Sequence, residues 1–228
     1  MRFLTLASLT LTLCCAVTAG LTEENRFAKE WRAYQTWDKA NNPATDGIIA
    51  IGSSTIRMWS TLTQEMAPLP VLNRGFGGAK VADALEAIPF IVLPYKPRII
   101  VYYVGDNDLQ NAEADMNKPI EGFTNFVTEV RKTLPKVHFV YLSIKPSPKR
   151  TDAWPKAQQV NALMVKQCAA DPAMTFVDVG STLLDANGVA EPSLYKEDKL
   201  HMLPTGYARW TPVLKPVLEK LWAAGAGK

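Results

Sequence analysis

The sequence predicts an α/β fold, a three-layer α/β/α sandwich in which helices cover both faces of one parallel sheet of five strands. Short apolar runs alternate along the chain with longer segments in which apolar residues recur at helical spacing. Of the 228 residues, 47% are hydrophobic and 21% are charged, which is the balance of an ordinary globular protein. Glycine and proline mark loops throughout, but no repeat or change of composition separates a second domain. We therefore expect a single domain over residues 20–228.

The expected helices and strands alternate from the beginning of this domain. An amphipathic opening helix is expected over residues 23–41, where aromatic residues recur at helical spacing. Five apolar runs are typical of buried strands: 47–51, 71–73, 99–104, 138–144 and 175–179. Four further segments have helical character: 81–93, 119–134, 154–170 and 204–223. Because parallel strands are joined by right-handed crossovers, this alternation predicts a parallel sheet with helices on both faces. We expect its strands in the flavodoxin-like order 2-1-3-4-5.

Residues 1–19 have the pattern of a secretory signal peptide. One basic residue is followed by an apolar run and by small residues that end at Ala19, where we expect cleavage. The protein is then expected to be exported, to the periplasm or the extracellular space, with no stable membrane association after cleavage. Two alternatives compete with this interpretation: an uncleaved membrane anchor, and a lipoprotein modified at Cys14 or Cys15.

The charge balance limits the kinds of partner that the protein can bind, and the cysteines limit the disulfides that it can form. Lys and Arg number 25 against 22 Asp and Glu, and the formal charge of +3 is too small for the basic surface that nucleic-acid binding needs. We therefore expect no nucleic-acid partner. After cleavage only Cys168 would remain, so no internal disulfide is expected, and its place in an apolar helical pattern predicts a core residue.

Small polar loops follow the first three expected strands at their carboxyl ends: GSST at 52–55, NRGFGG at 73–78 and GDND at 105–108. In the order 2-1-3-4-5 the first strand lies between the second and the third, so these loops meet where such sheets bind ligands. A fourth element, with Asp198 and His201, lies just before the last helix. Three residues apart in a turn, the carboxylate can hold one ring nitrogen while the other faces a nucleophile.

These four elements resemble the four sequence blocks of the SGNH (GDSL-type) hydrolase family and occur in the family's order. The similar segments are IGSSTIRMW at 51–59, NRGFGG at 73–78, GDNDL at 105–109, SIKPSP at 143–148 and DKLH at 198–201. The resemblance covers about residues 49 to 207 and implies the SGNH hydrolase fold. It also implies a serine esterase or acylhydrolase that cleaves carboxylic esters through an acyl-enzyme, with a small-molecule ester as substrate and no cofactor.

Carried over residue by residue, the resemblance implies Ser54 as the nucleophile and Asp198 with His201 as the acid–base pair. It implies three oxyanion donors: the backbone amides of Ser54 and Gly78 and the side chain of Asn107. These roles fit the chemistry, since a serine hydroxyl needs a neighbouring base and a tetrahedral intermediate needs fixed donors. Taken alone, Asn107 could instead cap a turn, and Gly78 could simply permit a positive φ.

Two serines are candidates for the nucleophile, and two histidines are candidates for the base. Ser53 stands where most family members have aspartate, although a Gly-Ser-Ser form is familiar, so either serine could attack; alignment favours Ser54. The chain has two histidines, and His138 opens an apolar strand, so we expect it to be structural. His201 is then the base.

No metal ligand cluster is expected, because two distant histidines and one cysteine of the cleaved chain do not form one. Four acidic residues resemble a calcium loop superficially: Asp106, Asp108, Glu113 and Asp115. They lack the glycine and the terminal glutamate of such a loop, so we expect solvated carboxylates. Three basic residues follow the fourth expected strand and are expected to form a solvated face: Lys145, Lys149 and Arg150.

The fold and the catalytic residues do not identify the substrate. A carbohydrate O-acetylesterase and a lysophospholipase or thioesterase are alternatives among enzymes. A carbohydrate- or lipid-binding module with an inactive site is the alternative outside them. We expect short acyl groups of about two to four carbons, because the mostly polar connections 108–118 and 146–153 offer no run that could line an acyl tunnel.

Overall fold

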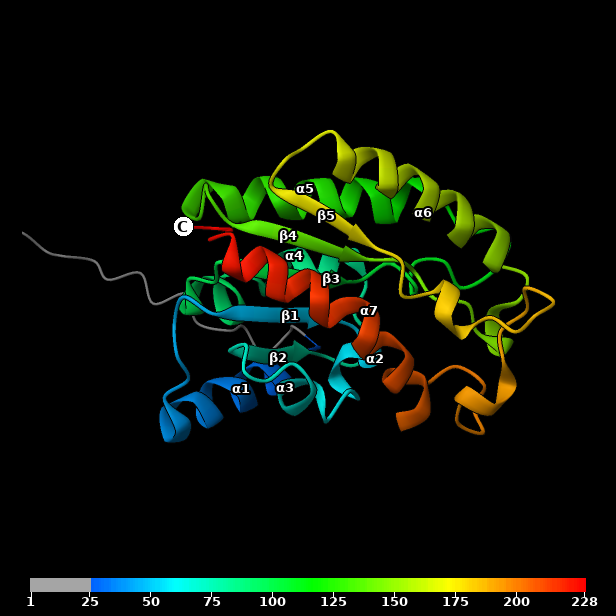
Figure 1. Cartoon of the computed structure of the whole chain (residues 1–228), viewed down its shortest axis with the longest axis horizontal. Helices are drawn as coiled ribbons and strands as arrows, with labels where there is room; N and C mark the ends of the chain where they lie inside the picture. Colours follow the sequence, from blue (N-terminus) through cyan, green and yellow to red (C-terminus); the bar gives the residue numbers. More distant parts are fainter. Residues whose placement is uncertain (1–25) are drawn as a thin grey trace, which may run out of the picture.

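The computed structural model describes residues 26–228, which contain one sheet of five parallel strands. In chain order the strands are β1 Ile48–Gly52, β2 Val71–Gly75, β3 Ile99–Tyr103, β4 His138–Leu142 and β5 Met174–Val177. They lie in the order β2-β1-β3-β4-β5, which confirms the predicted strand order (Figure 1). Gly52, at the end of β1, pairs with Gly75 on one side and with Tyr103 on the other.

Helices cover both faces of the sheet and complete the predicted three-layer sandwich (Figure 1). The helices on one face are α1 Ala28–Asn41, α4 Val81–Ile91, α5 Asn117–Thr133 and α6 Trp154–Ala169. Those on the other are α2 Ser54–Arg57, α3 Leu62–Glu65 and α7 Pro204–Ala223. Successive side chains of a strand point to opposite faces, so Ile49 and Ile51 pack under the first set and Ile48 and Ala50 under the second. Helices α2 and α3 were not expected, because four residues are too few to show a helical period.

Aromatic contacts attach the last helix close to the end of β1. Trp59, just after α2, stacks on Tyr207 of α7 with 5.3 Å between ring centroids. The Tyr207 hydroxyl also donates to the backbone oxygen of Thr55 at 2.8 Å. These contacts fix the beginning of α7 beside α2, although the two helices are far apart in the sequence.

Cys168 lies buried in α6, as the sequence predicts, and burial raises the pKa of its thiol to about 11. The expected signal peptide, residues 1–19, lies outside the described residues. Within residues 26–228, no helix combines the length and the apolar character needed to cross a bilayer.

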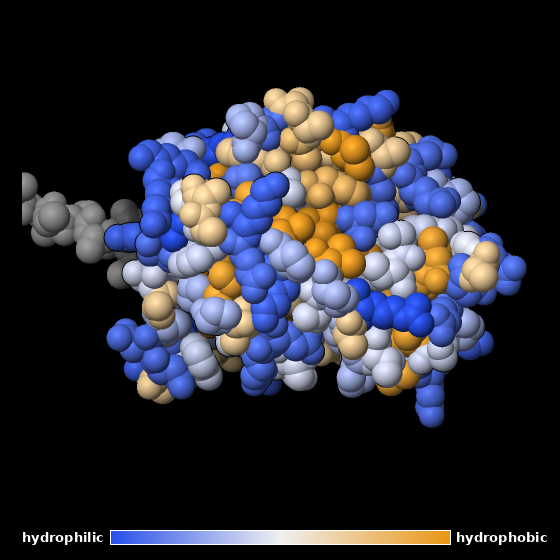
Figure 2. All heavy atoms as spheres, in the orientation of Figure 1, coloured by the Kyte–Doolittle hydropathy of each residue, from blue (hydrophilic) through white to orange (hydrophobic). Residues whose placement is uncertain are grey.

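The face that carries α7 has a mixed surface. Figure 2 shows hydrophilic and hydrophobic side chains interspersed on this face, with the hydrophobic ones most frequent near its centre. Four large hydrophobic residues of the described chain are exposed: Trp37, Leu163, Val165 and Val189. They come from three separate segments, and single exposed apolar residues of this kind are normal for globular proteins.

Candidate active site

The turn from β1 into α2 places two serines at the carboxyl edge of the sheet. Gly52 is required there, because a Cβ on this residue would lie 2.3 Å from Cγ1 of Ile56 and 2.7 Å from the backbone oxygen of Tyr103. The chain turns sharply at this point, and Ser54 becomes the first residue of α2. The loops after β2 and β3 flank this turn, because β1 lies between those two strands.

The structure brings Ser54, His201 and Asp198 together in one hydrogen-bonded chain. Nε2 of His201 lies 2.9 Å from Oγ of Ser54, and Nδ1 of the same ring lies 2.6 Å from Oδ2 of Asp198. A carboxylate only accepts hydrogen bonds, so the ring proton belongs on Nδ1 and Nε2 is left to accept the serine proton. Residues separated by 147 positions in the sequence thus form one unit.

The carboxylate of Asp198 also holds the turn that carries it. Its Oδ1 accepts hydrogen bonds from the backbone N–H of Leu200 at 3.0 Å and of His201 at 2.9 Å. Lys199 adopts the left-handed conformation within this turn, with a φ of +58°. The slight burial of Asp198 acts to raise the pKa of its carboxyl group. The hydrogen bonds from the His201 ring and from the two backbone amides outweigh this effect and hold the pKa well below its usual value. Asp198 is therefore a carboxylate at neutral and weakly acidic pH.

Ser53 points away from this unit. Its side chain is fully buried, and its hydroxyl donates to Oδ1 of Asp106 at 3.5 Å. Its backbone N–H donates to the backbone oxygen of Tyr103 at 3.2 Å. Of the two candidate serines, Ser54 is the one whose hydroxyl contacts His201.

The three expected oxyanion donors lie at this edge: Ser54 begins α2, and Gly78 and Asn107 lie on the loops after β2 and β3. Within residues 26–228, the backbone N–H groups of Ser54 and Gly78 donate to no other group, so both are available to a ligand. Gly78 has a φ of +76°, and a Cβ there would find nothing within 4 Å, so this residue faces open space. Asn107 donates one N–H of its amide to the backbone oxygen of Ala79 at 3.0 Å, which leaves the second N–H free. The amide thus bridges two loops instead of capping its own.

A comparison with models of known protein families shows which family this chain belongs to. A model of the GDSL-like lipase/acylhydrolase family matches residues 25–209, a range that includes every residue of the candidate site. The chain belongs to this family. The protein is therefore a hydrolase that acts on ester bonds, and the family resemblance seen in the sequence is confirmed.

Solved structures share the fold of this GDSL-like hydrolase. A Streptococcus pneumonia protein, whose description names platelet activating factor, is 22% identical with a TM-score of 0.70; the match covers 83% of this chain and 93% of that one. A GDSL-like lipase from Bacteroides thetaiotaomicron is 19% identical with a TM-score of 0.70, over 83% and 97% of the chains. A variant of Axe2, an acetyl xylan esterase from Geobacillus stearothermophilus, is 16% identical with a TM-score of 0.60, over 78% and 95%. No curated protein matches the chain.

A buried charge network supports the site of this family member and corrects the expectation of a solvated basic face. Lys145 is only 5% exposed and Arg150 is half-buried, so Lys149 alone of the three is exposed. Nζ of Lys145 donates to the backbone oxygen of Leu200 at 3.0 Å and lies 3.9 Å from Oδ2 of Asp106. Burial lowers the pKa of Lys145 to about 8, although the Asp106 carboxylate acts in the opposite direction. These partners meet only in the folded chain, so no local pattern indicated them.

The acidic loop after β3 is solvated only in part. Asp106 is buried, and its Oδ2 accepts a hydrogen bond from the Tyr103 hydroxyl at 3.2 Å. Asp108 accepts a hydrogen bond from the backbone N–H of Val81 at the start of α4, and burial raises its pKa to about 6. The expectation of solvated carboxylates is therefore wrong for both, because neighbouring elements supply donors for them. Within residues 26–228, no group of three or more His, Cys, Asp or Glu residues could hold a metal ion.

His138 lies at the other end of the sheet. It begins β4, whereas the candidate site lies beyond the carboxyl ends of the strands. Its Nε2 is 2.9 Å from the Thr175 hydroxyl on the neighbouring β5, and burial lowers the pKa of its ring. The expectation of a structural histidine is confirmed.

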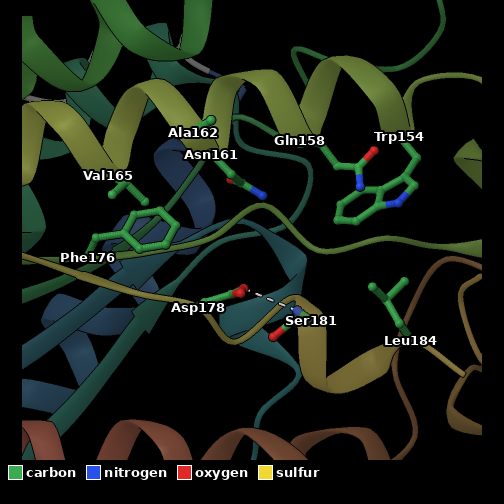
Figure 3. A pocket seen from close by; sticks show the side chains of 9 residues that line it. All are labelled: Trp154, Gln158, Asn161, Ala162, Val165, Phe176, Asp178, Ser181 and Leu184. Carbon is green, nitrogen blue, oxygen red and sulfur yellow. Dashed lines mark hydrogen bonds between the residues drawn. The ribbon is translucent and has the colours of Figure 1, made fainter. Parts of the chain in front are cut away.

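A separate pocket of about 270 Å³ lies between α6 and the end of β5 (Figure 3). Trp154 and Gln158 of α6 line it together with Phe176, while Asp178 lies at its floor and accepts a hydrogen bond from the backbone N–H of Ser181 (Figure 3). None of the candidate site residues lines this pocket. It is distinct from the site at Ser54.

Proposed function

We propose that this hydrolase is a serine esterase that cleaves small carboxylic esters through an acyl-enzyme on Ser54. The observation that carries the proposal is the hydrogen-bonded chain from Ser54 through the His201 ring to Asp198. A serine hydroxyl becomes a useful nucleophile at neutral pH when a neighbouring base takes its proton, and 2.9 Å between Oγ and Nε2 suits that transfer. Covalent labelling of Ser54 by a fluorophosphonate probe, located by peptide mass spectrometry, tests the proposal. A protein that takes no label would instead be a ligand-binding module with an inactive site.

The proposed reaction has two halves. In the first, Oγ of Ser54 attacks the ester carbonyl while Nε2 of His201 takes the hydroxyl proton. The carboxylate of Asp198 stabilises the resulting imidazolium without itself becoming protonated. The tetrahedral intermediate collapses as His201 returns the proton to the departing alcohol. In the second half, His201 takes a proton from water, which attacks the acyl-enzyme. The second tetrahedral intermediate then collapses, as His201 returns the proton to Oγ of Ser54 and the acid is released.

The negative oxygen of the tetrahedral intermediate is proposed to bind the free backbone N–H groups of Ser54 and Gly78 and the free amide N–H of Asn107. Donors that are already fixed in place do not have to reorganise as the charge develops, which is why such sites accelerate the reaction. The bond from Asn107 to Ala79 fixes this amide before substrate arrives.

Asn107→Ala is expected to lower kcat for p-nitrophenyl acetate by about 100- to 1,000-fold with little change in KM. The missing N–H matters most when the carbonyl oxygen is fully charged, so substrate binding changes less than turnover. Steady-state kinetics and thermal unfolding of the same variant provide the measurement. The control is Asn111→Ala, which removes an exposed amide from the same connection and should leave kcat near its native value. Near-normal kcat with a lowered Tm for Asn107→Ala would mean that the amide only bridges the two loops.

The acyl part of the substrate is proposed to be short. Three large apolar side chains of the two connections near the site, or at their borders, are the candidates for lining an acyl tunnel. All three contact the core, and Trp154 also lines the separate pocket beside α6, not the site at Ser54. Leu109 is 2% exposed, and Met116 and Trp154 lie against the same cluster of buried residues. Polar residues dominate what is left of these connections. An acetyl or butyryl group fits such a site better than a fatty chain.

The catalytic efficiency kcat/KM is therefore expected to be highest for p-nitrophenyl acetate or butyrate and to fall for octanoate and palmitate. Each methylene buried in a true acyl tunnel would contribute about 0.8 kcal/mol, so efficiency would then rise steeply with chain length. The four esters are compared below their solubility limits. Efficiency that climbs through octanoate would contradict this prediction and favour a lysophospholipase or thioesterase. A preference for acetate would be consistent with a carbohydrate O-acetylesterase, a class that includes the structural neighbour described as an acetyl xylan esterase.

A further inference from the structure

Arg150 reaches from the segment after β4 to the loop after β3. It ends the short 3-10 helix Pro148–Arg150, and its side chain is 15% exposed. One terminal nitrogen donates to the backbone oxygen of Asp106 at 2.5 Å and lies 3.7 Å from the carboxylate of the same residue. The other donates to Oδ1 of Asn107 at 2.9 Å. The guanidinium therefore contacts Asn107, the side chain proposed to bind the oxyanion. The contact is at the carbonyl oxygen of the Asn107 amide, on the side opposite to the N–H groups of that amide.

The chemistry of the two groups determines which way the Asn107 amide faces. A guanidinium carries only donors, so the atom of Asn107 that contacts Arg150 has to be the carbonyl oxygen. On the other side of the amide, the backbone oxygen of Ala79 only accepts, so it has to face Nδ2. Rotating the amide by 180° would place donor against donor at Arg150 and acceptor against acceptor at Ala79. Both hydrogen bonds would then be lost.

We propose that Arg150 is a positioning residue for ester hydrolysis, which holds Asn107 so that its free N–H is presented to the oxyanion. This inference rests on the proposed oxyanion role of Asn107. Arg150 also places a positive charge 2.9 Å from Oδ1, which polarises the amide and makes its N–H a stronger donor. The polar contacts of the Arg150 side chain within residues 26–228 are with Asp106 and Asn107 and not with Ser54, so it acts through Asn107.

Two other roles for Arg150 make different predictions. A residue that only stabilises the loop through Asp106 would change the unfolding temperature, with no selective loss of kcat. A residue that binds an anionic substrate would change KM for charged esters and leave neutral esters unaffected. If Arg150 is a positioning residue, replacing it lowers kcat for a neutral ester. The same replacement has little effect in a variant in which residue 107 carries no amide.

The test uses Arg150→Met, which keeps most of the side-chain length but has no donor, and Arg150→Lys, which keeps the charge and one group of donors. We expect Arg150→Met to lower kcat for p-nitrophenyl acetate about 10- to 100-fold, less than the loss of the whole amide, with KM within about twofold. Arg150→Lys should recover part of this loss. The matched control is Lys149→Met, which removes an exposed positive charge from the same turn and should leave kcat unchanged.

A double-mutant cycle separates positioning from general destabilisation. In an Asn107→Ala background, Arg150→Met should lower kcat by less than about threefold, because no amide remains to be positioned. An equal loss in both backgrounds, or a rise in KM with unchanged kcat, would overturn the proposal. If Arg150→Met does not fold, Arg150→Lys decides by the same cycle. Near-normal turnover of Asn107→Ala would refute the oxyanion role itself, whereas a slow Asn107→Ala beside a fully active Arg150→Met would refute the positioning role alone.

Discussion

Ser54→Ala is expected to lower kcat for p-nitrophenyl acetate by about a million-fold and to leave the fold intact. The nucleophile, the base and the carboxylate act as a unit, so removing one of them removes nearly all of their shared contribution. A loss of that size corresponds to about 8 kcal/mol of transition-state stabilisation. The hydroxyl of Ser54 contacts only the His201 ring in the described chain, so its removal should scarcely change the unfolding temperature. Single-turnover assays with p-nitrophenyl acetate measure the loss directly.

Ser53→Ala is the matched control, because it removes the neighbouring hydroxyl from the same turn. Ser53 is buried and donates only a long hydrogen bond to Asp106, so the variant should keep its activity within about tenfold. It should also lose about 1 kcal/mol of unfolding free energy, since a buried carboxylate oxygen loses a donor. An inactive Ser53→Ala beside an active Ser54→Ala would reverse the assignment of the nucleophile.

His201→Gln is expected to lower kcat by a similar factor, about 100,000- to a million-fold. Glutamine can occupy the same space and form a hydrogen bond, but it cannot accept the proton of Ser54 or return one to the leaving alcohol. Asp198 would keep its hydrogen bonds from the backbone N–H of Leu200 and of residue 201, so the turn should remain formed. Steady-state kinetics on p-nitrophenyl acetate, with circular dichroism to check the fold, provide the measurement.

His138→Gln is the control for the second prediction, since His138 is the other histidine of the chain. It bonds to Thr175 at the opposite end of the sheet, so the variant should keep native kcat while losing about 1 kcal/mol of unfolding free energy. If His201→Gln retained substantial turnover while His138→Gln lost it, the base would have been assigned to the wrong residue.

The local sequence was sufficient for the sheet and for the pair that precedes α7. Five apolar runs separated by segments of helical period predicted β1 to β5, and the preference for right-handed crossovers predicted a parallel sheet with helices on both faces. The strand order was expected from the flavodoxin-like arrangement, and the structure has that order. Asp198 and His201 are three residues apart, so a single turn determines their geometry, and the spacing predicted their contact. Features of this kind depend on neighbours in the chain, which is why the sequence alone determined them.

The contacts that complete the site were decided by the tertiary structure. Arg150 and Asn107 are 43 residues apart, and they meet because β3 and β4 are adjacent and parallel, so that both segments leave the same edge of the sheet. Lys145 has the composition of a solvated loop residue, yet it is buried because Asp106 and the backbone oxygen of Leu200 come to it from two other elements. Whether Ser53 or Ser54 faces His201 depends on the direction of the turn at Gly52, where Ile56 and the backbone oxygen of Tyr103 leave no room for a Cβ. Sequence periodicity reports which side of an element is buried, but only the assembled sheet determines which distant polar groups satisfy one another.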